Sequence, residues 1–177
     1  MQKTRFWILA GLLSAGFCLS ALAETKNTDI GEDARRFGAM LTPTFDAAIR
    51  LSHYTAPSRP TVALVQNGTV KDMINCKGTK CENLAVFNSE TNSVYVEVSV
   101  LEIPDILARG LLVHEFVHFL QYVNGKSFKT CEDLVKVEKE AYQAQNDFLI
   151  ENNYQITWEW PLLTGNTKPC ETNKALK

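Results

Sequence analysis

The sequence has no surplus of positive charge, no second long hydrophobic run after its first 23 residues, and no internal repeat or low-complexity tract. Its 18 lysines and arginines are outnumbered by 20 aspartates and glutamates, which gives a formal net charge of −2. Without a basic patch, the chain offers no electrostatic footprint for nucleic acid or for an anionic membrane surface. Without a further apolar segment of spanning length, we expect no stable membrane anchor in the mature protein.

Residues 1–23 have the features of a cleaved signal peptide. Lys3 and Arg5 form a positive start, an apolar stretch follows, and Ala21-Leu22-Ala23 matches the small-x-small pattern that precedes cleavage. Cleavage there leaves residues 24–177, which we expect to form a single domain. It removes two positive charges and no negative ones, so the net charge becomes −4. We therefore expect a periplasmic or secreted protein.

Four cysteines remain after that cleavage, namely Cys76, Cys81, Cys131 and Cys170. An even number in an exported chain favours two disulfides, for which three pairings exist. Local closure between Cys76 and Cys81 is the simplest pairing, and Cys131 with Cys170 would then tie the C-terminal tail to the start of a helix. The alternative, a four-cysteine zinc site, lacks the usual close pairs on both sides.

The spacing of apolar residues predicts an α+β domain with a helix, a small sheet and then two long helices. In chain order, the predicted elements span residues 30–51 (helix), 61–66, 84–88 and 93–98 (strands), 106–123 (helix) and 130–152 (helix). Pro43 either kinks the first helix or begins a second one. Thr130 is the expected N-cap of the last helix, and Asn124-Gly125 ends the helix before it.

The clearest chemical signal is the pentapeptide His114-Glu115-Phe116-Val117-His118, which lies in the apolar helix at 106–123. The two histidines are four residues apart, so on a helix both imidazoles project from one face and can hold one metal ion. Glu115 can then reach a water rather than the metal itself. This H-E-x-x-H pattern is typical of a zinc hydrolase. The alternative interpretation is a core helix with two hydrogen-bonded histidines and a glutamate that reaches its edge.

A catalytic zinc site normally needs a third protein ligand. His53, the remaining histidine, lies in a loop-like segment, and we interpret it as a surface residue. The last long helix carries four acidic residues that are better placed, namely Glu132, Asp133, Glu138 and Glu140. Glu140 falls about 70° from the centre of that helix's apolar stripe, and Glu138 about 90° away on the opposite flank. Asp133 lies near the helix start, where a carboxylate has an ordinary stabilising role. Periodicity alone does not choose among the four.

The segment H-E-F-V-H-F-L-Q, followed by E-K-E-A-Y-Q-A-Q, resembles gluzincin metallopeptidases, in particular small exported bacterial members whose second motif reads E-A-Y. The resemblance covers roughly residues 84–150. It implies a minimal zincin-like domain, with a small antiparallel-edged sheet packed on the motif helix and on the long helix that follows. It also implies one Zn²⁺ on His114, His118 and Glu140, with Glu115 as general base. Glu140 follows His118 by 22 residues, close to the separation found in gluzincins.

The expected function is hydrolysis of peptide bonds in a peptide or protein substrate. Glu115 would take a proton from the attacking water and pass it to the leaving amine. Tyr142 or Tyr154 could stabilise the oxyanion, and Gln121 could hydrogen-bond a ligand. The strand at 93–98 precedes the motif helix, where the resemblance to zincins implies the edge strand of the cleft, and a peptide substrate could add to it in extended form.

Two other functions stay open from the sequence. One is a zinc- or partner-binding envelope protein without turnover. The other is hydrolysis of a non-peptide amide, such as a cell-wall component. The oligomeric state is also left open.

Overall fold

The computed structural model describes residues 30–75 and 83–155, which form an α+β fold of helices around one small sheet. In chain order the elements are α1 (Ile30–Ser52), β1 (Thr61–Val65), α2 (Thr69–Met73), β2 (Ala85–Asn88), β3 (Ser93–Glu97), the 3-10 helix η1 (Val98–Glu102), α3 (Asp105–Val123) and α4 (Cys131–Glu151). The predicted α+β class is confirmed, as is the order of the three long helices and three strands. The short α2 and η1 are additions that the sequence pattern did not predict.

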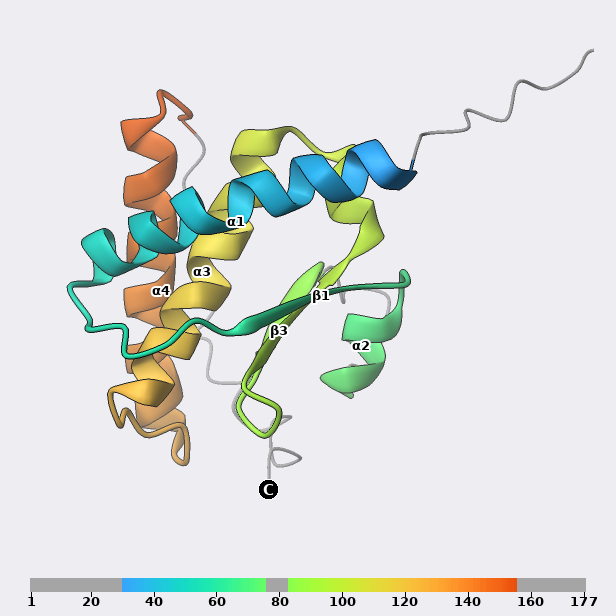
Figure 1. Ribbon diagram of the computed structural model, residues 1–177. Coiled ribbons are helices and arrows are strands. Elements are labelled where there is room, and N and C mark those ends of the chain that lie inside the picture. Colours follow the sequence, from blue (N-terminus) through green and yellow to red (C-terminus); the bar gives the residue numbers. More distant parts are fainter. Residues whose placement is uncertain (1–29, 76–82, 156–177) are drawn as a thin grey trace, which may run out of the picture.

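Helix α3 is the centre of the core. Its surface is apolar nearly all round, and α1 and α4 both pack against it, while the sheet lies on a further side (Figure 1). Gly110 allows the close approach of α4, because a Cβ there would lie 3.1 Å from Cδ2 of Leu149. Within the H-E-x-x-H motif, both histidines are buried and Glu115 is half-buried.

Helix α1 covers α3 with one apolar face. The ring of Phe45 meets the ring of Phe116 at 5.3 Å and that of Phe119 at 5.9 Å between centroids. Pro43 does not divide this helix, so the alternative of a second helix beginning there is wrong. Because Pro43 lies on the exposed face, the carbonyl that loses its helical partner can bond with water instead.

The sheet has the strand order β1-β3-β2, with β1 parallel and β2 antiparallel to β3. The prediction that residues 93–98 form the edge strand is wrong, because β1 pairs along the other side of β3, from Thr61 opposite Ser93 to Val65 opposite Glu97. The strand that borders α3 as an edge is β2. The sheet therefore has the expected antiparallel edge, but β2 forms it and not β3.

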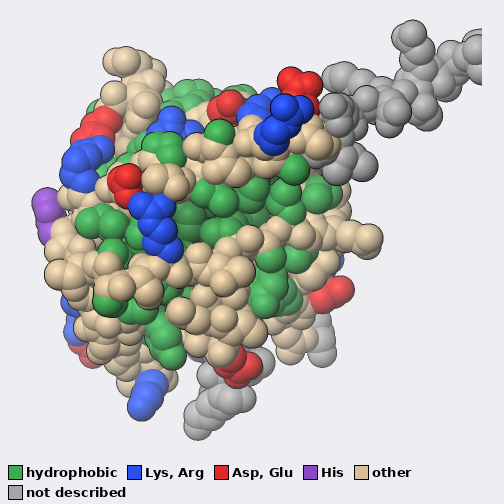
Figure 2. Space-filling view, in the orientation of Figure 1, with side chains coloured by type: hydrophobic (Ala, Val, Ile, Leu, Met, Phe, Trp, Pro, Cys, Tyr) green, Lys and Arg blue, Asp and Glu red, His purple; other side chains and the backbone are tan. Residues whose placement is uncertain are grey.

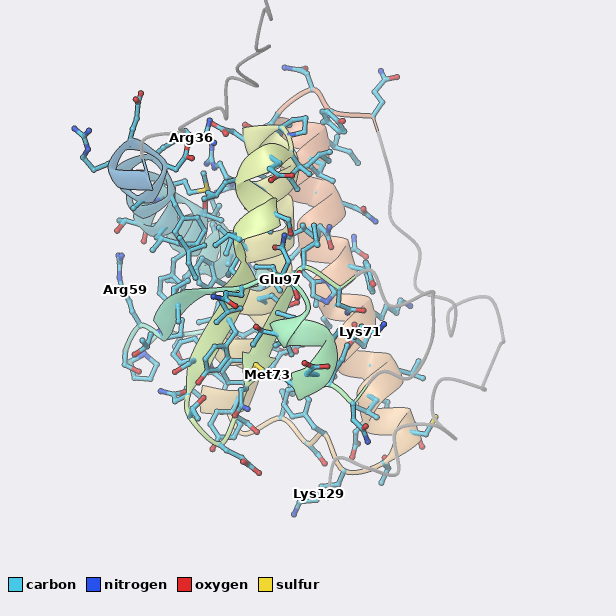
Figure 3. The ribbon with its side chains drawn as sticks, turned by 90° about the vertical axis from the view of Figure 1, so that its right-hand side faces the viewer. Arg36, Arg59, Lys71, Met73, Glu97 and Lys129 are labelled. Carbon is cyan, nitrogen blue, oxygen red and sulfur yellow. The ribbon has the colours of Figure 1, made fainter. Side chains whose placement is uncertain are left out.

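Glu97 at the end of β3 holds the turn that leads into α2. Its Oε1 accepts hydrogen bonds from the backbone N–H groups of Gly68 at 2.8 Å and Val70 at 3.1 Å. Gly68 has a φ of 88°, a left-handed conformation that glycine adopts without a side-chain clash. Figure 3 shows Glu97 beside the start of α2. The buried carboxylate of Glu97 therefore has a structural role.

The connection between α3 and α4 follows the predicted capping pattern. Gly125 after α3 has a φ of 75°. Thr130 caps α4: its Oγ1 accepts from the N–H of Asp133 at 3.1 Å, and Oδ2 of Asp133 accepts from the N–H of Thr130 at 3.2 Å. Hydrogen bonds from Ser127 and Thr130 lower the pKa of Asp133. The ordinary helix-start role expected of Asp133 is confirmed.

Several predictions lie outside the described residues, namely the signal peptide at 1–23 and the cysteines Cys76, Cys81 and Cys170. Cys131, the first residue of α4, is disulfide-bonded. The proposed pairings stay predictions. Among the helices in residues 30–75 and 83–155, none is long and apolar enough to cross a membrane.

Candidate metal centre

The two motif histidines lie between α3 and α4, and each is 8% exposed. Their rings are in edge contact, with centroids 4.7 Å apart, and their Nε2 atoms are 3.0 Å apart. The structure thus places both imidazoles on one face of α3, as the spacing of four residues predicts. The two Nε2 atoms therefore face the same small volume.

Glu138 of α4 completes a cluster with these two nitrogen atoms. Its Oε2 lies 3.3 Å from Nε2 of His114, and its Oε1 lies 3.4 Å from Nε2 of His118. Zinc binds His and Glu at about 2.0–2.2 Å, so neighbouring donors of a tetrahedral site lie about 3.3 Å apart. Separations of 3.0–3.4 Å match the donor spacing of such a site, and they are also those of hydrogen-bonded and ion-paired groups.

Glu140, the third ligand implied by the resemblance, lies elsewhere. Its carboxylate accepts hydrogen bonds from the hydroxyl of Tyr54 and from Nε2 of Gln121 at 3.1 Å, and it lies 3.7 Å from Nζ of Lys126. Side chains two residues apart leave a helix about 200° apart. Only the flank of α4 that carries Glu138 faces the histidines. The geometry therefore favours Glu138 in place of Glu140 as the third ligand.

The other residues weighed for the third position have different roles. Oε1 of Glu132 pairs with Nζ of Lys136 at 2.8 Å on the exposed side of α4. Asp133 belongs to the capping box described above. His53 follows the end of α1 and is exposed, as predicted for a surface residue.

The charges of the cluster stabilise one another. Burial lowers the pKa of His118, but the carboxylates of Glu138 and, more weakly, Glu115 outweigh it and raise that pKa to about 9. Burial also opposes ionisation of Glu138, yet the two imidazoles hold the pKa of Glu138 well below its ordinary value. Without a metal, the ionised carboxylate of Glu138 therefore pairs with a protonated His118.

Glu115 lies beside this cluster and is held by the edge strand. Its Oε2 accepts a hydrogen bond from the backbone N–H of Phe87 in β2, at 2.7 Å. That N–H points away from β3. The backbone N–H of Glu97 donates to the carbonyl oxygen of Leu84, and because hydrogen-bonded pairs alternate along an antiparallel ladder, Phe87 occupies a position that does not bond to β3. The negative charge of Glu115 also contributes to the raised pKa of His118. Glu115 is thus close to the donors without being one of them.

Aromatic side chains flank both histidines. The ring of Tyr142 meets the ring of His114 edge-on at 4.4 Å, and the ring of Phe128 lies 6.2 Å from that of His118. Burial, then the charges of Glu138 and Glu115, raise the pKa of Tyr142 to about 12. Its hydroxyl therefore stays protonated at neutral pH and can donate a hydrogen bond.

Tyr154, the second tyrosine considered from the sequence, packs against the hydrophobic core after the end of α4. Its backbone N–H donates to the carbonyl oxygen of Leu149 at 2.8 Å. These contacts give Tyr154 a structural role at the end of the helix.

Gln121 makes a hydrogen bond to one of the motif histidines, as its position on α3 suggests. It is fully buried, and its Oε1 lies 2.9 Å from Nδ1 of His118. Nδ1 of His114 is also buried, but has no hydrogen-bond partner within the part of the chain that the structure describes. The two histidines are therefore held differently, one by an amide and the other by ring contact with Tyr142.

A separate hollow of about 210 Å³ lies between α1 and β1. Figure 2 shows hydrophobic side chains gathered in this region. Its apolar lining includes Leu41, Phe45 and Phe116, and Arg59 is its charged residue. The guanidinium of Arg59 is already engaged by Asp46 at 3.2 Å and by the ring of Phe45. The lining has neither a metal-ligand set nor a nucleophile with a base, so we do not place the site there.

Three contributors to this region were not singled out from the sequence. Glu138 belonged to an acidic group without being chosen, although its separation of 20 residues from His118 is similar to that of Glu140. The N–H of Phe87 is a backbone group and carries no side-chain signal. Tyr54 reaches α4 from the end of α1, a contact between residues far apart in the sequence.

In comparisons with known proteins, no family model, no curated protein and no solved structure matches this chain. Its function is therefore inferred from the chemistry of its own residues.

Proposed function

We propose that this protein is an exported zinc-dependent hydrolase that cleaves peptide bonds. In this proposal His114, His118 and Glu138 hold one Zn²⁺, and Glu115 is the general base. The proposal is carried by the convergence of three residues: the Nε2 atoms of His114 and His118 lie 3.0 Å apart, and each lies 3.3–3.4 Å from one oxygen of the Glu138 carboxylate. Export rests on the signal-peptide pattern of residues 1–23, and the gluzincin resemblance supports the same chemistry.

The donor set fits zinc. Two imidazoles and one carboxylate are a known ligand set of catalytic zinc sites, in which the fourth position stays open. Two half-buried carboxylates, Glu138 and Glu115, both lie close enough to His118 to raise its pKa, and a dication compensates the cost of keeping both charged. When bound, the ion supplies Lewis-acid chemistry that activates water and polarises a carbonyl.

Glu115 supplies the proton transfer. The N–H of Phe87 fixes its Oε2 at 2.7 Å, which leaves Oε1 to take a proton from the attacking water and deliver it to the leaving amine. Because the anchor is a strand backbone, the position of the base is set by the sheet and not by a mobile side chain. This rigidity is what general-base catalysis requires.

Tyr142 supplies a hydrogen-bond donor on the opposite side, from α4. Its pKa of about 12 keeps the hydroxyl protonated, and the edge contact with His114 holds the ring beside the cluster. A donor in this position can stabilise the negative charge that develops on the carbonyl oxygen during attack.

The edge strand β2 supports a peptide as the substrate class. The outward-facing backbone groups of β2 belong to Ala85 and Phe87, and one of them already holds the general base. An extended peptide that pairs with this edge would bring its own carbonyl groups past Glu115. The expectation of strand addition is therefore transferred from residues 93–98 to β2.

The decisive experiment combines zinc analysis with peptide-library hydrolysis for the wild type, Glu115→Gln and Glu132→Gln. Glu132→Gln is the matched control, because it removes an exposed α4 carboxylate that pairs only with Lys136 in the described structure. We expect stoichiometric zinc in all three proteins, and a loss of about 10²–10⁴-fold in hydrolysis for Glu115→Gln alone.

Other outcomes separate the alternatives. Equal inertness of wild type and Glu115→Gln, with zinc retained, would favour a zinc- or partner-binding protein without turnover. Absence of stoichiometric zinc, together with a neutral effect of His114→Ala on stability in chelator, would reject the metal site itself.

A further inference from the structure

We propose that Tyr54, Glu140 and Gln121 form a positioning network that sets how tightly the cluster binds its metal. The inference rests on the proposed zinc site of His114, His118 and Glu138. The network begins after the end of α1, passes through α4 and reaches the metal-binding imidazole from behind. Tyr54 and Glu140 act only through Gln121.

Gln121 is the junction of the network. Its Nε2 donates to the carbonyl oxygen of Val137 at 2.8 Å and to Oε2 of Glu140 at 3.1 Å. Both of these partners can only accept, so the amide nitrogen must point toward α4. The amide oxygen must then point toward Nδ1 of His118, which lies 2.9 Å away.

This orientation selects the form of His118 that can bind a metal. An amide oxygen only accepts, so Nδ1 of His118 carries the proton and donates it to Gln121. The lone pair of a neutral His118 is then on Nε2, the atom that faces His114 and Glu138. With the amide reversed, its N–H would face Nδ1 and favour the proton on Nε2, which excludes the metal.

Glu140 is held in place as the acceptor for Gln121. The hydroxyl of Tyr54 donates to the same Oε2, and Nζ of Lys126 lies 3.7 Å from Oε1. Burial and the charge of Glu140 raise the pKa of Tyr54, so its hydroxyl stays a donor. Because Val137 also holds the amide, loss of Glu140 should weaken the preferred orientation without abolishing it.

A purely architectural role is the competing explanation, since Tyr54 and Glu140 also join α1 to α4. Such a role predicts a change in unfolding stability with no change in metal affinity. The proposed role predicts weaker metal affinity that depends on the presence of Gln121. Affinity and its coupling therefore distinguish the two.

The experiment measures the zinc dissociation constant of the full mature chain by competition with a chromophoric chelator. We expect Gln121→Leu and Glu140→Ala to weaken binding by roughly 10–100-fold, with one zinc still bound per chain. Glu140→Gln keeps an acceptor oxygen and should recover most of the affinity. Tyr54→Phe should weaken binding several-fold, and the control Glu132→Gln should leave it unchanged.

A double variant then tests the path. In the Gln121→Leu background, Tyr54→Phe should add no further loss, because Tyr54 acts through the amide. Unchanged affinity in Glu140→Ala, or full additivity of Tyr54→Phe with Gln121→Leu, would overturn the network while wild-type zinc binding still stands. A Glu140→Ala variant without any bound zinc would instead make Glu140 a ligand. A wild type that binds no zinc would overturn the proposed function as well.

Discussion

Helices α3 and α4 both border the candidate metal centre, but they contribute to it in different ways. Helix α3 is apolar and largely buried, and within five residues it supplies both histidines and the proposed base. Helix α4 is amphipathic and supplies one proposed donor, Glu138, from a series of acidic residues of which the others have other partners. A polar group on α3 is costly to bury, so its presence indicates function. On α4 a carboxylate is ordinary, and only its contacts show what it does.

The largest expected effect separates the two glutamates of α4. We expect Glu138→Ala to weaken zinc binding by more than about a hundredfold, because it removes a donor atom. Glu140→Ala should weaken it by roughly 10–100-fold, the range typical of residues that hydrogen-bond around the ligands. Zinc dissociation constants of both variants, with circular dichroism in chelator to check folding, provide the measurement. A greater loss in Glu140→Ala than in Glu138→Ala would reverse the assignment of the third ligand.

The sequence was sufficient to predict the class of the fold and most of its elements. Residues 106–123 are too apolar to lie anywhere but in a core, and Thr130 and Gly125 mark helix ends by local chemistry that needs no tertiary contact. The order of the strands in the sheet was harder to predict from the sequence. A hairpin between β2 and β3 is local, but the addition of β1 on the far side of β3 depends on contacts between distant segments.

The same division applies to the site. The spacing of His114 and His118 placed two donors on one face, since one helix fixes both. The choice between Glu138 and Glu140 depended on which flank of α4 faces α3. Sequence periodicity gives the angle of a side chain from the apolar stripe of α4, but it does not tell which other helix or strand packs against each flank. The hydrogen bond from the backbone of Phe87 to Glu115 was likewise beyond any residue pattern.

The next effect tests whether α4 contributes chemistry as well as a ligand. Tyr142 is four residues after Glu138, on the same face of α4, and its ring contacts His114 at 4.4 Å. We expect Tyr142→Phe to lower kcat by about a hundredfold, the magnitude found for loss of one oxyanion donor, with zinc affinity unchanged. Steady-state kinetics on a cleaved library peptide provide the measurement. An unaltered kcat would leave Tyr142 with a packing role only.

A pH dependence follows from the ionic pairing across the two helices. In the metal-free protein the pKa of His118 is raised to about 9, so His118 is mostly protonated at neutral pH. Zinc requires the neutral imidazole, so binding should release a proton, and affinity should fall by about tenfold for each pH unit below that pKa. Calorimetry in buffers of different ionisation enthalpy measures the released proton.

The matched variant for this test is Glu138→Gln, which removes the charge that raises the pKa of His118. It should bind zinc more weakly, and its affinity should lose most of its pH dependence between neutral pH and pH 9. If the wild type shows the same zinc affinity over that whole range, Glu138 does not keep His118 protonated in the metal-free protein.

The smallest expected effect lies at the start of α4, away from the cluster. Thr130→Ala removes the hydroxyl that accepts from the N–H of Asp133, and we expect a loss of about 1 kcal/mol in the free energy of unfolding. Thr130→Ser keeps a capping hydroxyl and should restore nearly all of it. Urea unfolding in excess chelator measures both. Since the cap acts on the first turn of α4, and Glu138 lies beyond that turn, zinc affinity should be unchanged in Thr130→Ala. A loss of zinc affinity with the cap would show that the first turn of α4 also positions Glu138.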